Sequence, residues 1–257
     1  MSQLYSAPWA GRSEIATLAE AALSELTARA QRDRDYAKTA SAAWLADALL
    51  SRHEYCPKRV TTALDKRKLK PREIIDDVFP ATARRLGELW RTDAITFAEN
   101  SVASARMQAL LVHLAPLWEC AEDAPGSGLA VLFTIPEQSH HTLGSRIAEA
   151  QLRALGVSLK RLSDPGVDLF CKTVAADPYD AILFSCTSGG SLASVRRMIT
   201  QARKQIGGLP PTLLGGLVLD HADQICTRAG VTEVSSDPRH VLSLCAAENR
   251  RREKATP

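Results

Sequence analysis

The sequence predicts an α plus α/β protein, in which a helical bundle precedes a five-stranded parallel α/β domain. Apolar residues recur at helical spacing through the first 120 residues. A segment rich in Pro, Gly and Ser follows at 122–128, and beyond it short apolar runs alternate with helical stripes. A chain of 257 residues can form one large domain or two ordinary ones, and this change of pattern favours two.

Amphipathic stripes with spacings of three and four residues predict the helices of the N-terminal half. One stripe covers 15–30 and a second covers 37–48, so one amphipathic helix is expected ahead of the bundle. Further stripes cover 75–89 and 98–112. Pro57 and Pro71 separate these segments, and Pro71 suits the first turn of a helix. Pro80 lies inside a stripe and should kink that helix.

The second half alternates between two periods. Short apolar runs predict strands at 128–135, 157–162, 180–186, 211–216 and 231–236. Helices are expected at 143–155, 168–176, 192–202 and 219–229, with a last helix starting at Asp237-Pro238. Such βα repeats imply a parallel, flavodoxin-like sheet that is covered on both faces. Ligands of these sheets bind beyond the carboxyl ends of the strands.

These patterns divide the chain into five parts. We expect an N-terminal arm and helix (1–36), a helical bundle (37–120), a linker (121–128), the α/β domain (129–248) and a basic tail (249–257).

Composition excludes several classes of protein. The net charge of +3, from 32 basic and 29 acidic residues, does not favour nucleic acid as a partner. No run approaches the ~20 apolar residues of a membrane helix, and the N-terminus lacks a signal-peptide core, so a cytoplasmic protein is expected. The six cysteines form no Cys-x-x-Cys pair, which argues against a disulfide framework or a local zinc site.

Three loops at predicted strand ends carry residues suited to a large ligand. The loop after the first strand contains Ser139, His140 and His141. The third strand ends in Ser185-Cys186-Thr187, and the fourth in Gly215-Gly216. Small residues allow a bulky ligand to lie close to the backbone, and imidazole is a common metal ligand.

These elements resemble the motifs of the cobalamin-binding domain family. His141-x-x-Gly144 fits the histidine motif, whereas His140 does not, because Leu143 stands where a glycine would be needed. The resemblance implies that His141 is the lower axial ligand of cobalt and that the nucleotide tail enters the domain beside the fourth strand. Ser139 replaces the family's aspartate, so the orientation of His141 should be weaker. The implied cofactor-binding residues are Ser139, His141, Gly144, Ser185, Thr187, Gly215 and Gly216.

The bundle adds a second part of the resemblance. Leu86-Gly87-Glu88-Leu89-Trp90 is similar to a signature in which a tryptophan covers the upper face of the corrin. In light-sensing adenosylcobalamin regulators a Glu-His pair follows, but this chain has Asn100 and Ser101 at those positions. The resemblance therefore implies that Trp90 and Asn100 face the cofactor, and that a hydroxo or aquo form is preferred over adenosylcobalamin.

One branch of this family fits the remaining features. No DNA-binding domain is expected ahead of the bundle, and the chain leaves no room for the barrel of a mutase. These features resemble the AerR/PpaA antirepressors of purple photosynthetic bacteria. The resemblance implies a light- or redox-responsive regulator, not an enzyme, that binds a CrtJ/PpsR-type repressor of photosystem genes. Direct DNA binding is not expected.

Two alternatives remain open on the sequence alone. A corrinoid methyl-carrier protein of a methyltransferase system has a similar bundle and corrinoid domain. A haem-binding sensor is the other, because one histidine beside a flat macrocycle serves either metal. Tyr5 and Trp9 near the N-terminus are candidate anchors for a partner protein.

Overall fold

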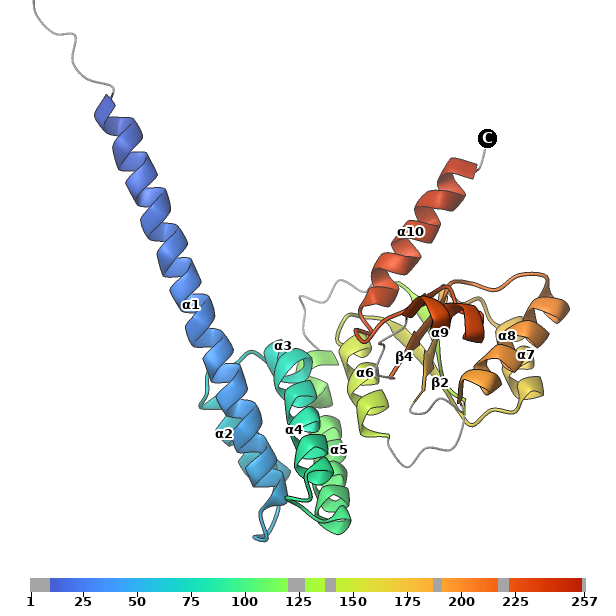
Figure 1. Ribbon diagram of the computed structural model, residues 1–257, viewed down its shortest axis with the longest axis horizontal. Helices are drawn as coiled ribbons and strands as arrows, with labels where there is room; N and C mark the ends of the chain where they lie inside the picture. The colour runs from blue at the N-terminus through green and yellow to red at the C-terminus, as the bar shows by residue number, and fades with distance from the viewer. Residues whose placement is uncertain (1–9, 120–127, 137–141, 187–190, 217–221, 256–257) are drawn as a thin grey trace, which may run out of the picture.

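The computed structural model of the protein describes residues 10–119, 128–136, 142–186, 191–216 and 222–255. A helical N-terminal region is followed by a sheet of five parallel strands with helices on both sides (Figure 1). The predicted fold class is therefore confirmed. Within the described residues, no helix is long and apolar enough to cross a membrane.

The N-terminal half begins with one very long helix, α1 (Ala10–Leu50). The expectation of a separate helix ahead of the bundle is wrong, because both predicted stripes lie on α1. The residues between the stripes include neither Gly nor Pro, so nothing in them interrupts the helical backbone. The other elements are α2 (Pro57–Asp65), α3 (Pro71–Glu73), the π-helix η1 (Ile74–Val78), α4 (Phe79–Arg91) and α5 (Phe97–Glu119).

The π-helix η1 lies where Pro80 was expected to kink a helix. The N–H of Phe79 donates to the carbonyl of Ile74, five residues earlier, in place of the usual bond over four residues. Pro80 lies in the first turn of α4 and has no N–H to donate. The expected disturbance therefore takes the form of a wider helical turn, which changes the direction of the side chains around Asp76.

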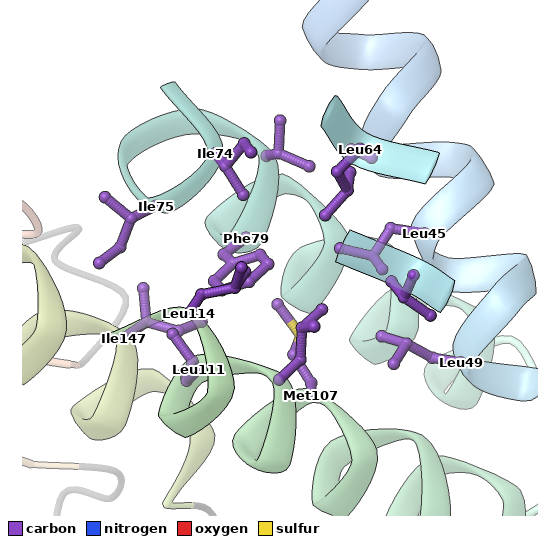
Figure 2. Close-up of a cluster of buried hydrophobic side chains, with 14 of the residues drawn as sticks. Leu45, Leu49, Leu64, Ile74, Ile75, Phe79, Met107, Leu111, Leu114 and Ile147 are labelled. Carbon is purple, nitrogen blue, oxygen red and sulfur yellow. The ribbon is translucent and has the colours of Figure 1, made fainter. Parts of the chain in front are cut away.

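The core of the bundle is formed mainly by side chains of α1, α2, η1, α4 and α5 (Figure 2). Arg106 of α5 closes the C-terminal end of α1, since its Nη1 donates to the carbonyls of Leu49 and Ser51, each at 2.7 Å. A cation at this position also suits the negative end of the helix dipole. The largest fully buried side chains of this core are Leu45, Leu49, Leu64, Ile75, Phe79, Leu86, Met107, Leu110 and Leu114.

The α/β domain follows the predicted order of strands and helices. The strand order is β2-β1-β3-β4-β5, and every pair is parallel. Gly156, expected to end a helix, has a φ of 73° just after α6. The elements are β1 (Ala130–Ile135), α6 (Leu143–Arg153), β2 (Ser158–Ser163), α7 (Val167–Ala176), β3 (Ala181–Ser185), α8 (Ser191–Ile206), β4 (Thr212–Gly215), α9 (Ala222–Ala229), β5 (Glu233–Val234) and α10 (His240–Ala255).

Alternating residues of the strands divide the core into two layers. Leu132, Phe184 and Leu214 pack toward α7, α8 and α9. Phe133 and Leu183 pack on the opposite face, with α6 and α10. α10 continues to Ala255, so most of the segment expected as a basic tail is helical.

Helix α6 joins the two halves. Ile147 of α6 belongs to the core of the bundle (Figure 2), as does Ala154, which directly follows α6. Polar contacts cross the same junction: Arg72 Nη1 donates to the carbonyl of Ala154 at 3.0 Å, and Gln151 Nε2 donates to the carbonyl of Ile75 at 3.3 Å. The η1 segment is thereby held against the α/β domain.

Candidate functional site

A cavity of about 460 Å³ lies at the carboxyl ends of β1, β3 and β4, on the sheet face that carries α6 and α10. Phe133 and Leu183 form its apolar floor, and Ser185, Gly215 and Gly216 form its rim. In the order β2-β1-β3-β4-β5 the connections reverse direction between β1 and β3, which is where open α/β sheets bind ligands. The remaining lining residues are Asp76, Pro80, Ala83, Arg84, Gly144, Ser145, Ile147, Ala148, Gln151, Ser236, Asp237, Pro238 and Arg239.

Gly215 and Gly216, at the end of β4, lie very close to the backbone of neighbouring segments. Gly216 has a φ of 93°, and a Cβ there would lie 2.5 Å from the carbonyl oxygen of Cys186. A Cβ on Gly215 would lie 3.0 Å from the carbonyl oxygen of Ser235. Any side chain at Gly216 would therefore combine a strained backbone with a direct overlap. The rim of the cavity depends on glycine at this position.

The bundle closes one side of the cavity through η1 and the start of α4. Asp76 Oδ2 accepts a bond from Arg72 Nε at 2.7 Å and lies 3.5 Å from Arg239 Nη1 of the α/β domain. Its other oxygen, Oδ1, is buried and has no hydrogen-bond partner among the described residues. A buried acceptor without a donor is costly, so a ligand that donates to Oδ1 would stabilise this arrangement.

The segment after β5 adds further charge to the rim. Arg239 donates to both carboxylate oxygens of Asp237, and this contact holds the pKa of Asp237 below its ordinary value. The same guanidinium faces Asp76, so Arg239 links the α/β domain with the bundle. Asp237 therefore remains an anion beside the cavity well below neutral pH.

Four of the predicted site residues meet at this cavity: Gly144, Ser185, Gly215 and Gly216 line it together. Ser139, His141 and Thr187 lie outside the described residues, so their roles stay predictions. The cavity is large enough for a nucleotide-sized group and not for a whole corrinoid. Its small rim residues and apolar floor fit the nucleotide tail that the resemblance implies.

Trp90 and Asn100 are not among the residues that line the cavity. Trp90 lies at the end of α4, is 39% exposed, and has its ring centroid 6.3 Å from that of Phe97, which is 65% exposed. Both rings are thus partly accessible to solvent on the bundle. The role of Trp90 and Asn100 over the upper face of the cofactor stays a prediction.

Asp76, Arg84 and Arg239 were not identified from the sequence, although they line the same cavity. Asp76 lies in the π-helix η1, and the sequence signal near this turn was Pro80 within a helical stripe. Arg239 follows Asp237-Pro238, which the sequence indicated only as a helix start.

Comparison with known proteins supports the family resemblance. Residues 42–115, most of the helical bundle, match the family model for the B12 binding domain. An uncharacterized 20.5 kDa protein in the bchF-crtJ intergenic region of Rhodobacter capsulatus is 28% identical over 171 residues, which are 66% of this chain and 89% of that protein. The HTH-type transcriptional repressor CarH of Myxococcus xanthus is 27% identical over 195 residues, 73% of this chain and 62% of CarH.

A solved structure shares the fold. The monomethylamine corrinoid protein of Methanosarcina barkeri is 14% identical, with a TM-score of 0.63 over 79% of this chain and 96% of that one. This likeness extends across both the helical region and the sheet domain. With the B12 binding domain match and the two relatives, the resemblance to cobalamin-binding proteins is confirmed.

Proposed function

We propose that this chain is a cobalamin-binding regulator, not an enzyme, whose cofactor state controls its binding to a transcriptional repressor of the CrtJ/PpsR type. The observation that carries the proposal is the cavity at which the strand ends and the bundle meet. The B12 binding domain match supports the cofactor. The similarity to a protein of the bchF-crtJ region and to a transcriptional repressor supports a regulatory role.

The residues of the chain have distinct tasks in this proposal. His141 would be the protein ligand of cobalt, and Ser139 would orient its imidazole. Ser185, Gly215 and Gly216 would border the nucleotide tail, beside the apolar side chains of Phe133 and Leu183. When bound, the cofactor supplies a cobalt centre with an exchangeable upper ligand. Asn100 and Ser101, in place of a Glu-His pair, favour a hydroxo or aquo ligand over adenosyl.

The cavity also suggests how the cofactor state reaches a partner. Side chains of the bundle and of the α/β domain line the same space, so an occupant contacts both. A ligand shifts the position of the bundle only by its different affinity for the two arrangements. Couplings of this kind are typically about 1–3 kcal/mol, or roughly 5–150-fold in the affinity for a partner.

An absorption titration tests the choice of cofactor. We expect the full chain to retain hydroxocobalamin through gel filtration, with a spectrum shifted from that of free hydroxocobalamin, and to bind haemin and adenosylcobalamin more weakly. Retention of haemin alone would contradict the proposal. Efficient methyl turnover by the cob(I)alamin form with methyl donors and activating proteins would favour a methyl carrier instead.

A further inference from the structure

The long helix α1 extends far beyond the bundle (Figure 1). Among the residues of α1 whose burial the structure describes, the buried ones lie in the last ten positions, from Ser41 to Leu49. Residues 16–36, here called the projecting segment, span about 31 Å at the usual helical rise. Leu23 and Leu26 in this segment are 64% and 63% exposed. Near the C-terminal end of this segment, Arg34 Nε donates to Glu73 Oε1 of α3 at 2.8 Å. A long helix whose side chains are mostly exposed is only marginally stable in water, so a packing partner is expected.

The apolar face of the projecting segment is not a continuation of the face that packs into the bundle. Successive residues of an α-helix are rotated by about 100°. At this rotation the exposed apolar side chains Ala22, Leu23, Leu26 and Ala30 centre roughly 135° around the axis from the buried set Ala42, Leu45, Ala46 and Leu49. The bundle therefore cannot cover this second face.

The charged residues beside this second apolar face indicate which partner covers it. Glu20 and Arg34 lie on one edge of it, and Glu25 and Arg29 lie on the other. The midpoint of both pairs is the same residue, Thr27. Two such helices, antiparallel about a two-fold axis near Thr27, bring Glu20 of one copy level with Arg34 of the other, and Glu25 level with Arg29. Within the part of the chain that the structure describes, Glu20 and Arg29 form no ion pair, whereas Glu25 pairs with Arg32 at 2.9 Å and Arg34 pairs with Glu73 at 2.8 Å.

We propose that the projecting segment pairs with the same segment of a second copy of this chain as an antiparallel helical pair. Leu26 of each copy packs near the axis, beside Leu26 and Ala30 of the other. A parallel pair would place Arg34 beside the basic edge at Arg29, and Glu20 beside Glu25. Edge charges of this kind set the orientation of paired helices. Asp33 limits the apolar face at its C-terminal end.

Sedimentation equilibrium of the full chain tests the pairing. We expect a dimer at micromolar concentration, and a monomer for Leu26→Asp with an unchanged Tm, because Leu26 is outside the bundle core. Leu169→Asp is the matched control, since Leu169 is 53% exposed on α7 and should leave the dimer intact. A monomeric wild-type chain, or a dimer unaffected by Leu26→Asp, would overturn the proposal.

Two further variants test the orientation. Arg29→Glu should raise the dimer Kd by about tenfold, because it opposes Glu25 at two symmetric sites, and the swap Glu25→Arg with Arg29→Glu should recover most of the loss. A mixture of Ala22→Cys and Ala30→Cys chains should form the 22–30 disulfide between copies, identified by mass spectrometry. A disulfide between two Ala22→Cys chains would show parallel pairing and overturn the proposal.

Discussion

Replacement of His141 by alanine is expected to weaken binding of hydroxocobalamin by at least about 100-fold. The reason is that loss of a residue that only orients a metal ligand costs about 10–100-fold, and loss of the ligand itself should cost more. The measurement is an absorption titration of the full chain. Ser139→Ala should give the smaller loss of an orienting residue, about tenfold.

His140→Ala is the matched control for this prediction. His140 neighbours His141 in the same loop, but only His141 has Gly144 three residues later. His140→Ala should therefore keep the affinity within about threefold, against the 10–100-fold expected for an orienting residue. A greater loss with His140→Ala than with His141→Ala would show that the other histidine holds the cobalt.

Replacement of Gly216 by alanine is expected to lower the free energy of unfolding by about 2–6 kcal/mol, the sum of two costs. Backbone strain at a positive φ costs about 1–3 kcal/mol. The overlap of the new Cβ with the carbonyl of Cys186 adds about 1–3 kcal/mol. Urea denaturation, read separately in the presence and absence of hydroxocobalamin, measures this loss.

Gly207→Ala separates these two causes. Gly207 has a similar φ of 77°, but a Cβ there meets no atom within 4 Å. Its replacement should cost about 1–2 kcal/mol from strain alone. An equal loss for both variants would contradict the close approach of Gly216 to Cys186. Gly215→Val places its side chain in the rim. Its loss of binding free energy for hydroxocobalamin should exceed its loss of free energy of unfolding.

The strands and most helices could be predicted because each has a local signal. β1 and β3 are mainly apolar runs, and Gly156 follows α6 in the conformation that glycine favours. The same local signals misled at α1. The stripes at 15–30 and 37–48 predict two helices, although both lie on one continuous helix, because a stripe reports an apolar face and not the path of the backbone.

The site was less accessible to sequence reasoning, because part of it is assembled across the chain. Parallel strands end at one edge of their sheet, and this rule alone could place four of the lining residues together: Gly144, Ser185, Gly215 and Gly216. The contact of Asp76 with Arg239 joins residues that are far apart in sequence, through a π-helix and a loop after β5. No local pattern encodes such a pairing.

The most direct test of the proposed function is titration calorimetry of the full chain with a CrtJ/PpsR-type repressor. The chain is measured without cofactor and loaded with hydroxocobalamin, each in darkness and in light. The account predicts that loading changes the affinity for the repressor by at least about fivefold, the lower end of typical coupling. His141→Ala in the presence of hydroxocobalamin should match the cofactor-free chain. Equal affinities in all states would contradict the account and leave cofactor carriage as the better explanation.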